Sequence, residues 1–565
     1  MTADAYVVLV GDNAAALEAL SRSNARRLAG AGWSRRVADP FIAVYAPSTS
    51  RLDIVAALDG HGAIIGEMFD HAGRPLSTAE RGVMACRALD ADRATDIVSS
   101  CWGRYVLIRR TSGDVAILRD PSGAVEAVTW RKDGVSVIAP NAPPALNCLM
   151  PDDLAIDWGS VKGLMRRSGG YRHELALSGF TPVASGALLS IGPAGVRSRQ
   201  IWRPSEVYRT ARDRRRPDLR EVVDRAVQAL AGDRNWVAEV SGGLDSAIVA
   251  GALSDHQRAR VTHWVNHFVD DPEGDEREFA RPVVERYGYR LTEVRRDGLT
   301  LSAPRLAESA DSFRPPVNDL DTDYNDDIAA RVQSSGAWGS LTGQGGDVVF
   351  FQMPTFLIAF DEVQERGLRA RAEVLHGAAR WTGQSLWPKT WLRARRAHHT
   401  LMSDRKHPWL DDLKGVPPAK AMQILGLVKG QAYQGGAVRS RHGPCVNPLL
   451  SQPVMEAGLA WSSVDLTWGG RAAYADVIPP SIFNRRSKGE LGTFYGEAVA
   501  RNLDFLRNYL LDGELAGAGL LPQGLADEMT REALVWRGGF SRLLTLALTE
   551  AWLRRWQARI ASSRV

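Results

Sequence analysis

Apolar and polar positions divide the chain into a strand-rich first part and a second part in which strands and helices alternate. In the first part, short runs of β-branched and aromatic residues are separated by Gly, Asp, Ser and Pro at the spacing typical of hairpins. These runs lie at residues 6–10, 104–108, 115–118, 127–130 and 135–139. The pattern predicts a β-rich domain that ends near residue 202.

The pattern changes after residue 218. A stretch with helical periodicity at 222–230 precedes an apolar strand at 236–240, a Gly-rich turn, a second helix and another strand at 261–268. A β-turn-α-β unit of this kind predicts a parallel sheet with helices on its faces. Residues 357–565 have a mostly helical pattern.

A basic stretch separates the two parts. Its arginines crowd around Pro204 and Pro217, a composition that predicts a surface linker. A nucleic-acid tether is an alternative, although a solvated run of charges is the more common explanation. The arginines are Arg209, Arg212, Arg214, Arg215 and Arg216. We therefore divide the chain into 1–203, a linker at 204–218, and 219–565.

Composition limits the possible classes of protein. Hydrophobic residues make up 45% of the 565 residues and charged residues 24%, the balance of an ordinary globular protein with several domains. No apolar run approaches the roughly 18 residues of a membrane-spanning helix, and no secretory signal is recognisable. The four cysteines are too sparse for a disulfide framework and include no CxxC pair for zinc. We expect a cytoplasmic protein.

The net charge and the number of tryptophans do not identify a binding partner. A formal charge of +5 is small for this length, so no nucleic-acid partner is expected. The seventeen tryptophans suit peptide or nucleotide grooves, but most of them are expected to pack in cores.

The segment with the clearest chemistry lies between the strand at 236–240 and the following helix. Adjacent glycines let the backbone approach an anion, and the helix N-terminus directs N–H groups and a positive dipole end at it. Serine hydroxyls add donors, and a carboxylate beside a polyphosphate implies a bridging Mg²⁺. The alternative is a tight Gly-Gly turn capped by serine. The segment is Val240, Ser241, Gly242, Gly243, Leu244, Asp245 and Ser246.

SGGxDS between a strand and a helix resembles the PP-loop of the ATP pyrophosphatases. These enzymes cleave ATP between its α- and β-phosphates and pass AMP to a carboxylate or a base carbonyl. A second Gly-rich segment, which contains Gly343, Gln344, Gly345 and Asp347, is similar to the second glycine loop of the asparagine-synthetase-like branch. Asp245 and Asp347 are expected to share one Mg²⁺, because both loops follow parallel strands. A helix N-cap is the alternative for Asp347.

Three further segments resemble the same branch. They are the acidic-aromatic stretch at 274–280, the stretch at 441–450, and a basic motif at 485–490. In the basic motif, Lys488 takes the place of the lysine that reaches the acyl-adenylate, where an ammonium stabilises negative charge that develops during adenylation. Arg485 and Arg486 are equally consistent with that role and with solvated surface.

The first domain resembles the glutaminase domain of asparagine synthetase through residues 103–105 and 118–123. That resemblance implies an α+β domain, a β-rich sandwich of the class II glutaminase type, in front of an α/β synthetase domain. The glutaminase reaction needs a cysteine directly after the initiator methionine. Thr2 occupies this position, and no glutamine-binding segment is recognisable. We therefore expect a degenerate scaffold that delivers no ammonia.

Without delivered ammonia, the amine must arrive with the substrate, as in β-lactam synthetases and lasso peptide cyclases. A β-lactam synthetase has a tyrosine three residues before its second metal aspartate, whereas this chain has Gln344, and an amide is no base at pH 7. A peptide α-amine, with an ordinary pKa of roughly 7.7–8.0, needs no strong base. Positioning is then the main task.

The resemblance therefore favours an ATP- and Mg²⁺-dependent, AMP-forming lasso peptide cyclase. It implies a precursor peptide as substrate, with a leader peptidase and a leader-recognition protein as partners. Three alternatives stay open: an amide ligase for a small substrate, such as an ammonia-dependent asparagine synthetase or a β-lactam synthetase; a PP-loop enzyme that modifies tRNA; and a non-catalytic scaffold.

Two groups of polar residues receive no firm role from the sequence. The acidic run can attract a substrate ammonium or form a solvated loop, and His398, His399 and His442 are expected to be surface or structural. The acidic run comprises Asp319, Asp321, Asp323, Asp326 and Asp327.

Overall fold

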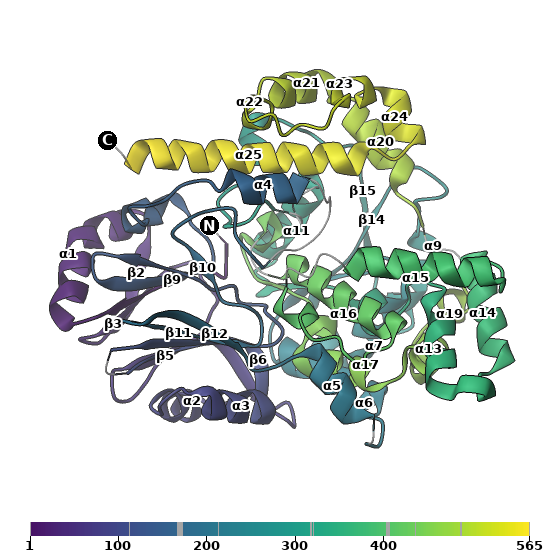
Figure 1. Ribbon diagram of the computed structural model, residues 1–565, viewed down its shortest axis with the longest axis horizontal. Helices are drawn as coiled ribbons and strands as arrows, with labels where there is room; N and C mark the ends of the chain where they lie inside the picture. Colours follow the sequence, from purple (N-terminus) through teal and green to yellow (C-terminus); the bar gives the residue numbers. More distant parts are fainter. Residues whose placement is uncertain are drawn as a thin grey trace.

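The computed structural model contains two six-stranded antiparallel sheets and one five-stranded parallel sheet (Figure 1). Its description covers residues 2–111, 113–165, 173–212, 214–316, 319, 321–402, 407–434, 437–485 and 489–563. The antiparallel sheets belong to the first part of the chain and the parallel sheet to the second. The expected β-rich first domain and α/β second domain are therefore both confirmed.

The two antiparallel sheets pack face to face as a sandwich. Val8 of one sheet and Ile65 and Ile117 of the other share one apolar cluster between the sheets. On the outer faces, Leu9 packs against α1 (Ala14–Gly30) and Ile64 lies in the cluster that contains α3 (Ala91–Ser100). The central strands, such as β1 (Val7–Gly11), β5 (Gly62–Asp70) and β6 (Cys101–Arg110), are buried on both faces because helices cover both outer faces, which gives four layers (Figure 1).

All five predicted strands of this domain are present, but its helices and several strands were not anticipated. The first sheet runs β10 (Thr181–Pro182), β8 (Val128–Lys132), β9 (Val135–Ala139), β1 (Val7–Gly11), β3 (Ile42–Pro47), β2 (Trp33–Ala38). The second runs β12 (Gly195–Gln200), β11 (Ala187–Gly192), β7 (Val115–Arg119), β6 (Cys101–Arg110), β5 (Gly62–Asp70), β4 (Ile54–Ala56). The helices are α1, α2 (Thr78–Ala85), α3 and α4 (Trp158–Met165).

The order in which the chain adds strands to the parallel sheet reverses at the centre of the sheet. Its order is β15 (Leu291–Arg295), β14 (Val261–Phe268), β13 (Trp236–Glu239), β16 (Gly339–Leu341), β17 (Cys445–Val446). The chain builds outward from β13 to β15 and then returns to the other side of β13. A crevice at the carboxyl ends of β13 and β16 is the place where such sheets bind ligands.

Helices cover both faces of this sheet. Ile248 of α7 (Leu244–Ala252) and Val284 of α9 (Arg277–Glu285) pack with Trp264 on one face. Ile328 of α11 (Thr322–Ser334) packs with Val237 on the other. α6 (Leu219–Ala231) precedes β13, so the predicted helix–strand–helix–strand order is confirmed.

The basic stretch at 204–218 is more structured than the surface linker that its composition indicates. It contains α5 (Pro204–Ala211), in which Tyr208 is buried. Arg209 pairs with Asp412 at 2.6 Å, and Arg216 pairs with Asp465 at 2.6 Å. The division of the chain into domains at this stretch stays a prediction.

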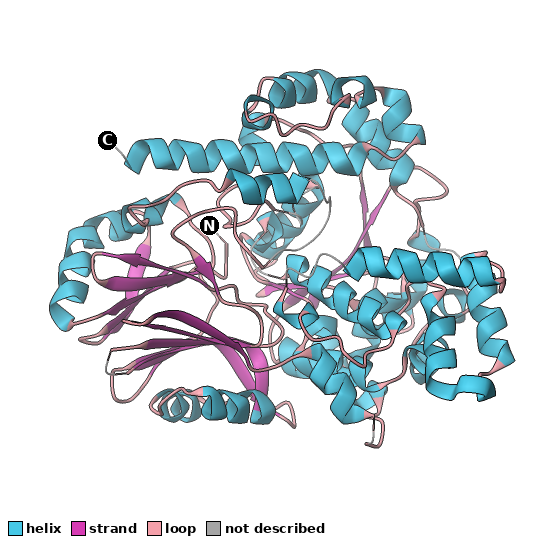
Figure 2. Cartoon of the chain, viewed as in Figure 1, coloured by secondary structure: helices cyan, strands magenta, loops and turns pink. Residues whose placement is uncertain are grey.

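The rest of the chain is mostly helical, as predicted, and its last helix returns to the sandwich (Figure 2). Trp552 and Trp556 donate to the carbonyl of Ser312, and Arg559 donates to that of Ala142. No helix in the described part of the chain combines the length and apolar character that crossing a membrane requires. The helices after the second glycine loop are α13 (Leu357–Arg366), α14 (Ala372–Thr382), α15 (Pro388–Met402), α16 (Pro418–Gly430), α17 (Gln452–Ala460), α18 (Ser463–Gly469), α19 (Pro480–Phe483), α20 (Gly492–Ala500), α21 (Leu503–Leu511), α22 (Glu514–Gly517), α23 (Leu525–Glu528), α24 (Arg531–Trp536) and α25 (Phe540–Ser563).

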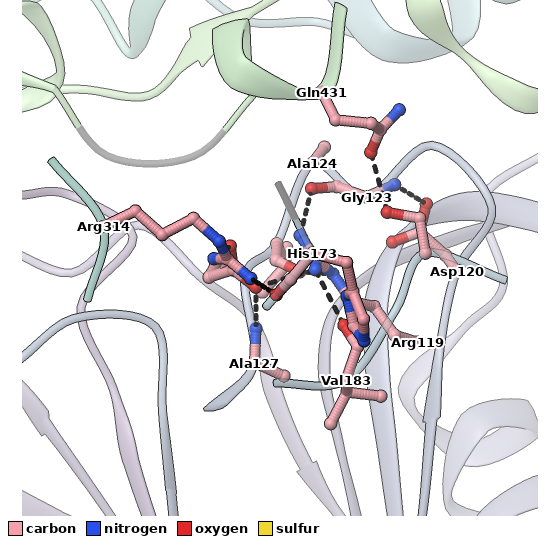
Figure 3. A network of polar contacts seen from close by, with 12 residues as sticks. Arg119, Asp120, Gly123, Ala124, Ala127, His173, Val183, Arg314 and Gln431 are labelled. Atoms are coloured by element: carbon pink, nitrogen blue, oxygen red, sulfur yellow. Dashed lines mark hydrogen bonds and ion pairs between the residues drawn. The ribbon is translucent and has the colours of Figure 1, made fainter. Parts of the chain in front are cut away.

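A buried polar network joins the sandwich to the second half (Figure 3). Arg119 donates to the carbonyls of Gly123, Val125 and Val183 and to the carboxylate of Glu126 at 2.7–2.9 Å. Arg314, from the second half, binds the other oxygen of Glu126 at 2.8 Å. Because these charges are paired inside the protein, the network holds the two halves together rather than forming an open site.

Candidate active site

The first glycine loop connects β13 to α7 at the carboxyl edge of the parallel sheet. Gly242 has a φ of +82°, and a Cβ there would lie 2.7 Å from the carbonyl oxygen of Glu276. Only glycine fits this conformation and this close approach. The loop is therefore pressed against the start of α9.

Serine hydroxyls brace the loop from within. The amide of Ser241 donates to Oγ of Ser246 at 3.1 Å, and the amide of Gly243 donates to Oγ of Ser241 at 3.2 Å. Ser246 Oγ donates to the carbonyl of Gly243 at 3.2 Å. The N-cap residue of α7 is Gly243, which has no side chain to cap the helix. The helix N-terminus thus presents backbone N–H groups at a pre-shaped turn, as anion sites do.

The second glycine loop follows β16 and contacts the first loop directly. A Cβ on Gly343 would lie 2.5 Å from the amide nitrogen of Ser246, and one on Gly346 would lie 2.3 Å from Cγ of Asp245. Thr342 shapes the turn, since its Oγ1 accepts from the amide of Gln344 at 3.0 Å. The structure therefore brings the two sequence-predicted loops together at the switch point of the sheet.

The carboxylates of these loops fit a magnesium–polyphosphate complex. The Asp245 carboxylate lies against Gly346, the residue before Asp347. No cluster of three or more His, Cys, Asp and Glu side chains suited to a metal occurs among the described residues. Mg²⁺ commonly takes one or two carboxylates and completes its shell with phosphate and water oxygens. The Asp245 carboxylate, beside an anion-binding turn and against the loop that carries Asp347, fits that donor set.

The basic motif at 485–490 flanks the first loop. Arg485 pairs with Glu276 at 2.8 Å and lies 3.9 Å from the ring centre of Phe279. The amide of Gly489 donates to Glu276 at 2.8 Å. Lys488 and Arg486 lie outside the described residues. Arg485 is largely buried rather than solvated surface, and its pairing with Glu276 anchors this segment beside Gly242.

Arg471 is a cation of this site that the sequence analysis missed. It lies in the 3-10 turn Gly470–Tyr474 and donates to the carbonyls of Ile482 and Phe483 at 3.3 and 2.8 Å. Burial lowers its pKa, and the nearby carboxylate of Asp245 acts in the opposite direction. No local pattern marks this arginine, since only the fold places it near Asp245.

A second group that was missed lies on the α11 face, at the carboxyl end of β13. Tyr324 donates its hydroxyl to Glu239, and Arg439 lies 3.6 Å from the other oxygen of that carboxylate. Burial, followed by the charge of Glu239, raises the pKa of Tyr324 well above its ordinary value. The group ties α11 to the strand that carries the first glycine loop.

The acidic run differs from both of its sequence-based interpretations. Asp319 is buried and accepts from the amide of Val438 at 3.0 Å. The other four carboxylates are in ion pairs, so they neither form a solvated loop nor await a substrate ammonium. The pairs are Asp321 with Arg296, Asp323 with Arg305, Asp326 with Arg305 and Arg441, and Asp327 with Arg331. Asp327 also lies at hydrogen-bond distance from the ring of His267.

Comparison with known proteins agrees with this site. Residues 218–434 match the family model described as asparagine synthase. This stretch contains both glycine loops, whereas the sandwich and Lys488 lie outside it. The match identifies a domain of the asparagine synthase type. The chain is thus an ATP-dependent carbon–nitrogen ligase, and AMP-forming chemistry fits that family.

Whole-chain comparisons add little. No curated protein sequence matches the chain. One similar structure, described as the allosteric regulatory enzyme of purine biosynthesis, has 11% identity and a TM-score of 0.23 over 52% of this chain and 80% of its own. Another, glutamine phosphoribosylpyrophosphate amidotransferase from B. subtilis with ADP and GMP, has 12% identity and a TM-score of 0.23 over 60% and 81%. Scores this low carry no argument, so the glutaminase-like nature of the sandwich stays a prediction.

Proposed function

We propose that the chain is a lasso peptide cyclase. A side-chain carboxylate of Asp or Glu in a core peptide attacks the α-phosphorus of ATP, which forms an acyl-adenylate and releases pyrophosphate. The N-terminal amine of the same peptide then attacks the acyl carbon. The amide bond forms, AMP leaves with the electrons of the broken acyl–oxygen bond, and the amine loses a proton to solvent.

The contact between the two glycine loops carries the adenylation part of the proposal. The backbone from Val240 to Ser246 binds the pyrophosphate portion of ATP, together with Gly343, Gln344 and Gly345. Asp245 and Asp347 would hold Mg²⁺, which neutralises phosphate charge when bound. Lys488 stabilises the charge that develops on the α-phosphate and the acyl oxygen, and Arg471 adds a fixed positive charge beside Asp245.

The contacts of Thr2 and Ala3 are consistent with an amine that comes with the substrate. The hydroxyl of Thr2 accepts from the side-chain amide of Asn141 at 3.2 Å, and the amide of Ala3 donates to the carbonyl of Ser440 at 2.7 Å. A threonine in this packed position supplies no thiol to release ammonia from glutamine. We propose that the sandwich acts as a scaffold, and that a leader peptidase and a leader-recognition protein prepare the precursor peptide.

The other candidates are amide ligases with small substrates. Gln344 weighs against a β-lactam synthetase, because a neutral amide cannot remove a proton from an amine. An ammonia-dependent asparagine synthetase would use the same loops, so only the substrate separates it from a cyclase.

Isotope exchange between pyrophosphate and ATP tests the proposal. Exchange is expected with Asp- or Glu-containing peptides and is expected to disappear in Lys488→Met, with Lys162→Met, an exposed lysine on α4 of the sandwich, as the matched control. Incubation with ATP, aspartate and ammonium is the decisive comparison. Asparagine formation there, or no exchange with any acid-bearing peptide, contradicts the cyclase proposal.

A further inference from the structure

Helix α15 (Pro388–Met402) carries an unusual concentration of positive charge. It contains no acidic residue, and Lys389, Arg393, Arg395 and Arg396 are all exposed. None of these four side chains forms an ion pair with a residue that the structure describes. Other arginines of the described residues do form ion pairs, as Arg209 and Arg216 do. Unpaired cations gathered on one helix favour an anionic partner.

Exposed apolar side chains accompany these cations. Trp387, directly before the helix, is 74% exposed, Leu392 is 50% exposed and Leu401 is 47% exposed. The opposite face of the helix is fixed in the protein, because Trp391 packs its ring 4.6 Å from that of Phe360. An exposed face that mixes leucine and tryptophan with arginine is typical of surfaces that bind other chains.

A groove runs along one side of α15. Its cavity volume is about 450 Å³, and it lies between α15, the start of α13 and α16. Its lining is largely apolar, through Phe356, Leu357, Leu401 and Met422, and Arg393 stands at its edge. Helical spacing places Arg393 next to both Lys389 and Arg396 on the exposed face. The groove and the row of cations therefore form one continuous surface.

This surface adjoins the segment that leaves the second glycine loop. Pro354 and Thr355 line the groove, and they follow α12 (Gly346–Val349), which contains Asp347. Val348 and Met353 of the same segment pack against Gly426 of α16, the helix that supplies Met422. Figure 1 shows α15 on the outside of the molecule, beside α14 and α16. A peptide bound in this groove would contact α16, the helix that also packs against the segment after the second glycine loop.

We propose that the α15 groove binds an acidic segment of the peptide substrate. Apolar side chains of that segment enter the groove, and its carboxylates face Lys389, Arg393 and Arg396. The inference rests on the proposed function, because it supplies the positioning that a cyclase needs for a long flexible substrate. The groove would recognise peptides in which acidic residues alternate with apolar ones. The two glycine loops do not recognise that feature of a peptide.

The shape of the surface favours a peptide over other anionic partners. Single-stranded nucleic acid binds through a charged track and stacking rings. In this groove Phe356 and His398 are the residues with aromatic rings, and the rest of the apolar lining is aliphatic or methionine. A helix that lies on an anionic membrane inserts its apolar face. The main apolar face of α15 is already packed against Phe356 and Phe360.

Fluorescence anisotropy with defined probes tests the proposal on the full chain without ATP. The probe is a fluorescein-labelled peptide of alternating glutamate and leucine, and its glutamine–leucine counterpart measures the contribution of charge. The charge-reversal variant Arg393→Glu/Arg396→Glu is expected to weaken binding of the acidic probe by about tenfold or more. The matched control is Arg197→Glu/Arg199→Glu, which reverses two exposed arginines on β12.

A second variant separates the groove from the charges. Ala397 lines the groove, so Ala397→Trp fills it without a change of charge and is expected to weaken the acidic peptide but not an oligonucleotide. Equal binding of both peptides, or an unchanged affinity in the charge-reversal variant, overturns the proposal. So does tighter binding of single-stranded RNA or of anionic phosphatidylglycerol vesicles. Since no ATP is present, failure here is distinct from failure of pyrophosphate exchange, which tests the proposed function.

Discussion

Two turns of similar composition behave in opposite ways in the two halves of the molecule. The turn after β7 contains Asp120, Ser122 and Gly123, and the turn after β13 contains serine, glycine and Asp245. In the sandwich, Asp120 is fully buried and accepts from the amides of Tyr105, Ser122 and Gly123 at 2.8–3.2 Å. Backbone amides of the sandwich therefore bind both oxygens of this carboxylate.

The turn after β13 instead has its backbone shaped by serine hydroxyls, and its aspartate lies against a loop from another strand. A turn that contains Gly, Ser and Asp is therefore not by itself an anion- or metal-binding site. A site requires a helix N-terminus at a switch point and a second loop in contact with it. Four substitutions test this contrast.

The largest effect is expected from Asp347→Ala. Loss of one of two proposed magnesium carboxylates should reduce pyrophosphate exchange by about a thousandfold, since charge neutralisation on the phosphates is the main role of the ion. Exchange rates at saturating ATP and Mg²⁺ measure this. The matched control is Asp297→Ala, a carboxylate whose side chain is 79% exposed. Wild-type exchange in Asp347→Ala would remove this residue from the site.

Arg119→Met is expected to affect stability rather than catalysis. The change leaves three carbonyls and the carboxylate of Glu126 without their buried donor, which should lower the free energy of unfolding by about 3 kcal/mol. Urea denaturation measures the loss, with the exposed Arg199→Met as its control. The folded fraction should keep wild-type exchange per molecule. A selective loss of exchange at unchanged stability would contradict a purely structural network.

Gly346→Ala should damage the contact between the loops. The new Cβ would lie 2.3 Å from Cγ of Asp245, so the carboxylate must move. We expect exchange to fall by about tenfold to a hundredfold, because small displacements of a positioned group are costly. Gly517→Ala, which meets no atom within 4 Å, provides the control. Equal activity in both variants would show that the loops tolerate separation.

The smallest effect concerns the pH dependence of stability at Asp120. Burial raises the pKa of this carboxyl to about 6 in the folded protein, against hydrogen bonds from Ser122 and the charge of Arg119, which act to lower it. Because the folded state binds the proton more tightly than the unfolded state, the contribution of Asp120 to stability decreases as pH rises through about 6.

The expected size is about 1 kcal/mol between about pH 5 and 7. The measurement is the difference in unfolding free energy between wild type and Asp120→Asn at both pH values, since other titrating groups cancel in that difference. A pH-independent difference would mean that Asp120 has the same pKa in both states.

Local patterns sufficed for the strands and for both glycine loops. The strands at 6–10 and 261–268 and the turn at 241–243 were predicted because apolar runs and Gly-Gly turns act within a few residues. The helices of the sandwich were missed, since α1 alternates polar and small residues without a strong apolar face. Arg471 was missed because its relation to Asp245 depends on two segments far apart in the sequence.

The alternation of strands and helices and the position of the two loops after parallel strands follow from the amino-acid sequence alone. These depend on side-chain periodicity and on the identity of single residues. The contact between the loops, the pairing of the acidic run and the exposed cations of α15 beside a groove are visible only in the folded protein. Those are properties of distances between remote segments, and packing sets them through contacts that no local pattern records.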